Sequence, residues 1–245
     1  MASAGWAKAK PAQQQKAADA KESQTTSSKG GEQSAAGDEL NTVLAMMNKA
    51  SATFKSAQGD FESTDYQKLV DDKFTQQGHI YFRHAKDGVK DGVDVAFDLE
   101  GKAPKQVVYQ KGVLRVYEKN IAQITERHVG NNRSDVDAFL SLGFGASGND
   151  LVRDYEVKML GWETISGTKT AKLELAAKNT KIRQTYPKIL IWIDPEKDIL
   201  VQQQFFENSG DYRLVHYSNM KLNEKISDDK FQIKTSGKVT TVQAQ

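Results

Sequence analysis

The chain has 245 residues, of which 38% are hydrophobic and 27% are charged, and its 34 Lys and Arg against 32 Asp and Glu leave a net charge of only +2. This length suits one folded domain with polar additions, and the balanced charge, without a basic stripe, argues against a nucleic-acid binder. Cysteine is absent, which excludes disulfides, thiolate metal sites, a cysteine nucleophile and a cysteine lipid anchor within this sequence. No apolar run approaches the roughly 18 residues that a membrane-spanning helix needs.

Residues 1–37 contain no Val, Ile, Leu or Phe and are rich in Ala, Gln, Lys and Ser. Such a segment cannot bury enough apolar surface to offset its ordering entropy, so we predict a disordered tail. The opening residues Met1-Ala2-Ser3-Ala4-Gly5 read like the small-residue end of a secretory signal whose apolar part is missing. We therefore expect that the signal lies upstream or was trimmed, and that the protein is periplasmic.

A helix is predicted from Asp38, a favoured N-cap residue type, to about Lys55. Its apolar side chains recur at helical spacing and form one face: Leu40, Val43, Leu44, Met47, Ala50 and Phe54. This face either plugs a sheet or forms part of a ligand lid, and in a half-open barrel the two roles can coincide.

From residue 80 onward the apolar pattern alternates with a period of two, as in strands. One strand is predicted over 93–100, and in the strand before it Ile80, Phe82 and His84 share one face while Arg83 lies on the other. Lys111-Gly112 is a tight-turn signal within a hairpin. The remaining predicted strands are 106–110, 113–117, 121–127, 155–160, 171–177, 189–194, 199–207 and 211–220. Sequential strands joined by short turns indicate an antiparallel meander.

A short amphipathic helix is predicted over residues 134–144, within the series of strands. It is capped by Ser134 and leads into the glycine-rich stretch 143–148. A second helical turn is predicted near 149–153. The glycine stretch follows a helix and lacks a Gly-Lys-Ser/Thr ending, so we interpret it as a lid hinge or helix C-cap and not as a phosphate loop.

The sequence offers no constellation for catalysis. The four histidines show no metal-ligand spacing, because His79 and His84 lie on opposite faces of one strand. No Gly-x-Ser-x-Gly nucleophile elbow is present, and no carboxylate pair stands out. We therefore expect no catalytic residues, no metal site, no cofactor and no enzymatic activity. The apolar stripes predict either a filled barrel core or the lining of a cavity, and composition does not choose between them.

Over residues 39–234 the chain resembles the outer-membrane lipoprotein carrier (LolA) family. The resemblance rests on six segments in the same order: 43–54, 78–83, 112–117, 139–145, 189–195 and 223–231. It implies a mainly β fold with helices, an unclosed antiparallel β-barrel covered by a helical lid and similar to LolA and LppX, over 38–235. A disordered C-terminal tail is expected over 236–245.

The resemblance implies a periplasmic carrier that binds acyl chains of lipoproteins or lipids in a hydrophobic cavity and shuttles them toward the outer membrane. The implied partners are this cargo, an inner-membrane releasing transporter and an outer-membrane acceptor, and we expect a monomer that does not bind nucleic acid. The candidate residues of the acyl cavity and lid are Leu44, Met47, Phe54, Ile80, Phe82, His84, Val95, Phe97, Leu114, Val116, Phe139, Leu140, Leu142, Phe144 and Trp192.

The chain departs from the family at Arg83-His84, where family members often carry Arg-Pro with the Arg pointing inward to hold the lid shut. Here His84 takes the inward position, where it either hydrogen-bonds a lid carbonyl or is an ordinary satisfied histidine. The alternative to a carrier is a lipid-sensing or protein-interaction module of the cell envelope with the same fold. An enzyme is the least favoured class.

Overall fold

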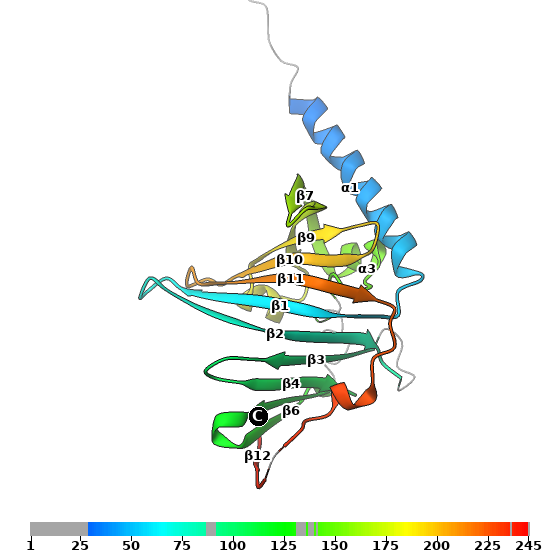
Figure 1. Ribbon diagram of the computed structural model, residues 1–245. Helices are drawn as coiled ribbons and strands as arrows, with labels where there is room; N and C mark the ends of the chain where they lie inside the picture. The colour runs from blue at the N-terminus through cyan, green and yellow to red at the C-terminus, as the bar shows by residue number, and fades with distance from the viewer. Residues whose placement is uncertain are drawn as a thin grey trace, which may run out of the picture.

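The computed structural model describes residues 29–86, 92–130, 136, 140, 142–235 and 237–244. Its helices are α1 (Lys29–Ser51), α3 (Gly148–Asp154) and α4 (Thr180–Thr185), with short 3₁₀ turns η1 (Lys119–Ile121) and η3 (Asp228–Phe231) (Figure 1). The strands are β1 (Ser56–Gln67), β2 (Asp72–His84), β3 (Val93–Leu99), β4 (Lys105–Gln110), β5 (Val113–Glu118), β6 (Gln123–His128), β7 (Tyr155–Ile165), β8 (Thr168–Ala177), β9 (Lys188–Asp194), β10 (Ile199–Phe206), β11 (Tyr212–Leu222) and β12 (Thr240–Gln243).

These strands form one sheet in the order β12-β6-β5-β4-β3-β2-β1-β11-β10-β9-β8-β7. Neighbouring strands are antiparallel except β12 and β6, which run parallel. Residues of β4 and β10, which are far apart in this order, line the same pocket, so the sheet curls around it. Within the described part of the chain the end strands β12 and β7 do not pair with each other, which confirms the predicted unclosed sheet.

The concave face of the sheet carries the main hydrophobic core. Ile189, Ile191 and Ile193 of β9 are fully buried there, because alternate side chains of a strand point to the same face. Helix α1 packs Val43 and Met47 against this core, as its apolar spacing predicts. The helix begins at Lys29, before the predicted start at Asp38, and its first turns project beyond the sheet (Figure 1).

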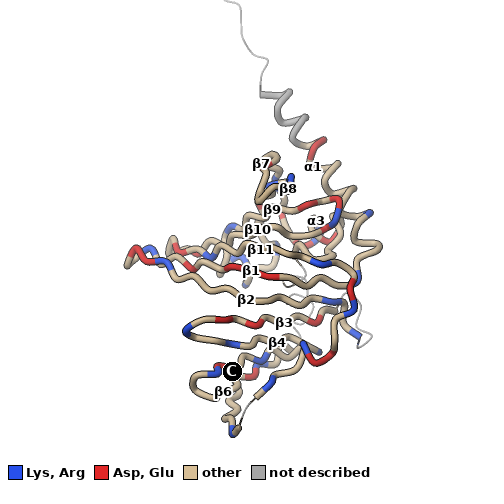
Figure 2. The backbone as a smooth tube through the Cα atoms, viewed as in Figure 1, with Lys and Arg blue, Asp and Glu red and all other residues tan. Residues whose placement is uncertain are grey.

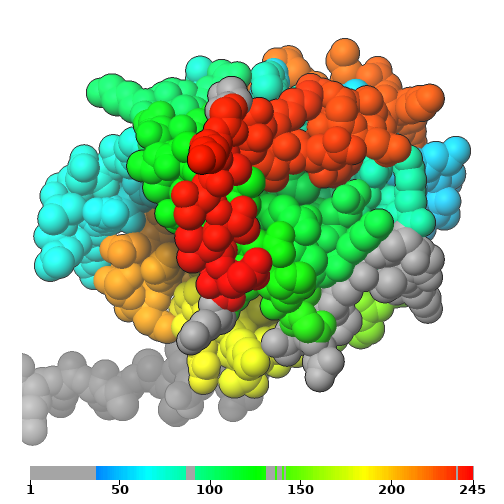
Figure 3. All heavy atoms as spheres, turned by 90° about the horizontal axis from the view of Figure 1, so that it is seen from below, coloured from blue at the N-terminus to red at the C-terminus, as the bar shows by residue number. Residues whose placement is uncertain are grey.

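The convex face is covered over strands β2 to β4 by residues 224–235, which we call the C-terminal strap. Ile226 and Phe231 of the strap pack against Tyr81, Ala96 and Val108 in a second apolar cluster. Figure 3 shows this C-terminal part of the chain, in red, lying across the middle of the chain, in green. Strands β2 to β4 are therefore buried on both faces, although period-two alternation predicted a strand over 93–100 with only one buried face.

Arg83 anchors the strap to the sheet. Its side chain is buried and pairs with Asp94 of β3 at 3.0 Å, and it also pairs with Asp228 of the strap. The guanidinium group lies 4.1 Å from the centre of the Phe231 ring, a favourable cation–π arrangement. The prediction that Arg83 points away from the face of Phe82 is therefore confirmed.

Two elements differ from the sequence predictions. Strand β1 lies between β2 and β11 at the centre of the sheet, yet its polar composition gave no strand signal. Residues 240–243, expected in a disordered tail over 236–245, form β12, because their backbone pairs with the otherwise open edge of β6. Most of the predicted lid helix over 134–144 lies outside the described residues. Among those that are described, no helix is long and apolar enough to cross a bilayer.

Candidate functional site

A pocket of about 390 Å³ lies between the concave face and the chain segment that precedes α3. Such a volume is near the lower end for small-molecule sites, which span roughly 300–1,000 Å³. Its apolar wall comes from six strands, from the segment 140–144 and from Tyr186 after α4. The apolar and aromatic lining residues are Phe61, Ile80, Val95, Phe97, Leu99, Val107, Leu140, Leu142, Phe144, Tyr186, Phe205, Val215 and Tyr217.

One end of the pocket is polar and reaches solvent. Asp65 and Arg213 lie there as an ion pair with a 2.5 Å separation, and the Arg213 side chain is 54% exposed. Ser63, Gln76 and Lys105 are further polar lining residues, and we call this polar end the pocket mouth. The pocket thus has an apolar interior and one polar, accessible entrance, an arrangement that suits an amphipathic ligand.

Deeper in the pocket, the Tyr217 hydroxyl accepts a hydrogen bond from the Gln203 side chain at 2.5 Å. Burial raises the pKa of the Tyr217 phenol above its usual range. The phenol therefore stays neutral across the physiological range, and its polar atom is satisfied by the protein itself.

The segment Gly143-Phe144-Gly145, which we call the lid segment, closes the pocket from the helical side. Phe144 stacks on Phe82 with ring centres 5.6 Å apart and meets Tyr217 edge-on at 5.1 Å. Both glycines have positive φ, +78° and +77°, a conformation that L side chains rarely adopt. A Cβ on Gly145 would also overlap the Phe54 ring, so this position needs glycine for two reasons.

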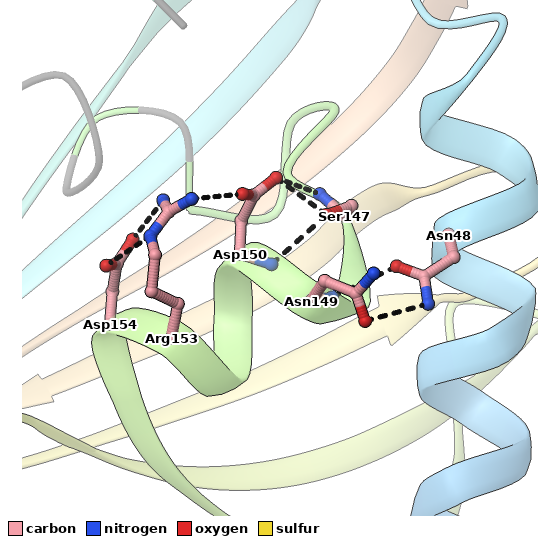
Figure 4. A network of polar contacts seen from close by, with 6 residues as sticks. All are labelled: Asn48, Ser147, Asn149, Asp150, Arg153 and Asp154. Carbon is pink, nitrogen blue, oxygen red and sulfur yellow. Dashed lines mark hydrogen bonds and ion pairs between the residues drawn. The ribbon is translucent and has the colours of Figure 1, made fainter.

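Helix α3 holds the C-terminal side of the lid segment against α1. Ser147 and Asp150 form a capping box at the start of α3, and Asn48 of α1 accepts the backbone N–H of Asn149 at 3.0 Å (Figure 4). The Asn48 amide in turn donates to the Asn149 side chain at 3.3 Å. Because α1 and α3 are joined by these bonds, the lid segment is fixed to the first helix at one end.

A buried carboxyl group lies in the turn between β9 and β10. Asp198 is 0% exposed, has φ +52°, and neither of its oxygens has a hydrogen-bond partner within the described ranges. Burial, and secondly the charge of Asp150, raises the pKa of Asp198 to about 8. The next residue, Ile199, forms a β-bridge with Phe144. An uncompensated carboxyl therefore lies at the base of the lid segment and is largely protonated at neutral pH.

The structure brings six of the fifteen predicted site residues into the pocket wall: Ile80, Val95, Phe97, Leu140, Leu142 and Phe144. Met47, Phe54 and Phe82 are buried in the adjoining core, and Leu44 and Leu114 are partly buried against it. Val116 pairs across the strands with pocket-lining Val107. Phe139 lies outside the described residues.

His84 continues the inner face of β2 but lies at the exposed end of the strand, outside the pocket wall. Its ring meets Phe54 edge-on with centres 5.9 Å apart. No hydrogen bond joins His84 to a lid carbonyl among the described residues, so that role stays a prediction.

Trp192 was wrongly placed in the cavity, because alternate residues of β9 face opposite sides. Ile191 and Ile193 occupy the concave face, whereas the Trp192 indole donates a 2.6 Å hydrogen bond to Glu163 on the other face. Lys172, its neighbour across the strands, lies 4.9 Å from the indole ring centre. Trp192 is thus part of a polar cluster outside the barrel.

Sequence reasoning missed the pocket residues of β1 and β11 in particular. Phe61, Ser63 and Asp65 belong to β1, for which no strand was predicted. Val215 and Tyr217 belong to a predicted strand, and their alternation could have assigned them to the inner face. Alternation alone did not say which face of that strand is concave.

Comparisons with known proteins concern mainly the fold. A family model described only as an uncharacterized protein matches residues 146–243, and none of the curated proteins matches the sequence. The crystal structure of MucB is similar with a TM-score of 0.51 and 15% identity, covering 83% of this chain and 66% of MucB, just under two thirds of that longer chain. An uncharacterized conserved protein from Thermus thermophilus has a TM-score of 0.51 at 7% identity over 84% of this chain and 99% of its own.

A LolA superfamily protein from Nitrosomonas europaea also matches, with a TM-score of 0.40 and 13% identity, over 79% of this chain and 97% of that protein. Helices and a lid segment cover the concave face of a single antiparallel sheet whose edges stay apart. The chain shares its overall fold with MucB and with the Thermus thermophilus protein, the two matches whose TM-scores exceed 0.5.

Proposed function

We propose that this protein is a carrier that holds an acyl chain of a lipid or lipoprotein in the pocket under the lid segment. The observation that carries the proposal is an apolar pocket with one polar mouth, enclosed by a lid segment whose only large side chain is Phe144. Each CH₂ group moved from water into such a site contributes about 0.8 kcal/mol. A long chain thus gains on the order of 10 kcal/mol before ordering costs are subtracted.

Binding proceeds by displacement of Phe144. In the closed pocket its ring covers Phe82 and Tyr217, so an entering chain replaces one apolar contact with another. Gly143 and Gly145 on either side provide the backbone freedom for this movement. Release then needs only an acceptor that is more apolar than the pocket, without a chemical step at this protein.

The volume of about 390 Å³ favours a single chain over a bundle of several. We further propose a periplasmic location, with cargo received from an inner-membrane transporter and delivered to an outer-membrane acceptor, as the resemblance to lipoprotein carriers implies. No catalytic role is proposed.

The test is binding of a fluorescent fatty acid, together with native mass spectrometry of protein purified from a membrane-containing host. Val107→Trp adds volume to the pocket wall and is expected to weaken probe binding at least tenfold. Ile124→Trp makes a similar change on the opposite face of the sheet, since Ile124 pairs with Tyr117 there, and is expected to bind normally. Equal binding by both variants, or a wild type that neither binds the probe nor retains lipid, would overturn the proposal.

The alternative is a lipid-sensing or protein-interaction module of the envelope. The similarity in fold to MucB motivates it. A sensor is expected to bind the probe without passing it to acceptor vesicles, whereas a carrier passes it on.

A further inference from the structure

The tip of the β1–β2 hairpin exposes large apolar side chains. Leu69 is 97% exposed and Val70 62% exposed, in the turn between Gln67 and Asp72. Polar residues and glycine are what such turns favour, so turn geometry does not account for this pair. The hairpin projects beyond the neighbouring strand ends (Figure 1), which holds both side chains away from the body of the protein.

A third exposed apolar side chain lies between this tip and the pocket. Phe74, 49% exposed, lies on the same face of β2 as Gln76 and Ile80, both of which line the pocket. Across the strand pair, Phe74 faces Asp65, which forms part of the pocket mouth. The exposed apolar side chains and the entrance to the pocket therefore lie at the same end of the sheet.

On the convex side of this end, a row of three aromatic rings across neighbouring strands is flanked by a lysine on each side. Tyr66 stacks on Tyr212 with ring centres 4.9 Å apart, and Phe206 lies 6.2 Å from Tyr212. The Lys188 ammonium lies 4.0 Å from the centre of the Phe206 ring, and that of Lys73 lies 6.0 Å from the Tyr66 ring. Tyrosine rings and flexible lysine side chains suit the boundary between lipid headgroups and acyl chains, because each has an apolar body and a polar end.

The charges at the tip cancel. Lys68 and Lys73 flank the apolar pair together with Asp71 and Asp72, and Figure 2 shows both signs side by side there. Attraction to an anionic surface therefore cannot be the main driving force at this tip, and burial of apolar surface must be.

We propose that the β1–β2 hairpin tip inserts Leu69 and Val70 into the interfacial layer of a lipid bilayer and thereby sets the pocket mouth against the membrane. This inference rests on the proposed carrier function, since it gives an acyl chain a short route past Phe74 and the pocket mouth between bilayer and pocket. The partner is the bilayer itself, including one of zwitterionic lipid.

The test is flotation of the full chain with phosphatidylcholine vesicles at low and high salt. We expect binding that high salt does not remove and that added phosphatidylglycerol changes little. The double variant Leu69→Ser/Val70→Ser is expected to bind at least tenfold more weakly. Leu160→Ser, a matched change at another exposed leucine (40% exposed) on edge strand β7, is expected to bind as the wild type does.

No flotation of the wild type, unchanged flotation of the double variant, or binding only to anionic vesicles at low salt would each overturn the inference. Fatty-acid probe binding without vesicles separates this inference from the proposed function. If the double variant keeps probe binding but loses flotation, both stand. If the wild type binds vesicles through this tip but no probe, the carrier function fails and the membrane contact stands.

Discussion

Replacing Asp198 with asparagine is expected to change how stability depends on pH. The folded state holds the Asp198 proton more tightly than the unfolded chain, because the carboxyl is buried without a partner among the described residues and its pKa rises from the ordinary value of 3.8 to about 8. Because the pKa is raised on folding, Asp198 is protonated in both states below pH 4 and does not lower the stability of the wild type there. As the pH rises from 4 to about 8, the unfolded state loses the proton first and the wild type loses stability. Each tenfold difference in proton affinity corresponds to about 1.4 kcal/mol, so the full loss is about 6 kcal/mol.

Asparagine has nearly the same shape as a protonated aspartic acid but does not ionise. The two proteins are therefore expected to be about equally stable near pH 4, and the Asp198→Asn variant is expected to be the more stable by about 4 kcal/mol at pH 7. Urea unfolding followed by tryptophan fluorescence at a series of pH values measures this difference. Taking the difference between the two proteins removes the contribution of every other titrating group.

Glu196→Gln, at an exposed position of the same turn, is the matched control and is expected to leave the pH profile unchanged. Parallel stability curves for the wild type and Asp198→Asn would refute the reasoning, since they would mean that Asp198 has the same proton affinity in both states.

Three further predictions concern the lid segment and the strap. Gly145→Ala is expected to lower the free energy of unfolding by about 2 kcal/mol or more, because of the positive φ and the steric overlap at this position. Gly237 also has a positive φ but has open space around it, so Gly237→Ala is expected to lower the free energy of unfolding by only about 1 kcal/mol. The same urea titration measures both variants. Arg83→Met leaves its carboxylate partner on β3 buried without a cation, and is expected to lower the free energy of unfolding by about 3–5 kcal/mol. Arg183→Met removes an exposed ion pair and is expected to lower it by less than about 1 kcal/mol. The pKa of Asp229 is lowered to about 2, mainly by a hydrogen bond from a strap lysine. The contribution of Asp229 to stability is therefore complete above pH 4 and is lost as the pH falls toward 2. Hydrogen exchange at these pH values should show that the strap loses protection before the rest of the sheet.

Most of the sheet could be predicted because its strands carry local signals. The strand predicted over 93–100 begins with β3 and extends one residue past its end. Lys111 and Gly112 both have positive φ, as a two-residue hairpin turn requires. Strand β1 could not be predicted because its residues are mostly polar, and its place at the centre of the sheet comes from backbone pairing with β2 and β11 on both sides.

The site was harder to predict than the fold. Periodicity identifies which residues share a face but not which face is concave, and Trp192 was misplaced for that reason. Asp198 gave no signal either, because an acidic residue that directly follows the turn sequence Asp194-Pro195-Glu196-Lys197 is expected to be exposed. Asp198 is nevertheless buried, and the adjacent Ile199 forms a bridge with the lid segment, which comes from a distant part of the chain.

The Arg83 anchor has a mechanical consequence. The strap packs against the convex face of strands β2 to β4 and the main core packs against their concave face. We therefore expect these three strands to be the least deformable wall of the pocket. We expect the pocket to widen on the opposite side instead, where the lid segment carries the Phe144 ring between two glycines. Under the proposed carrier function, a ligand enlarges the pocket by displacing the Phe144 ring while strands β2 to β4 stay in place, so the size of this one ring sets the space that a ligand gains.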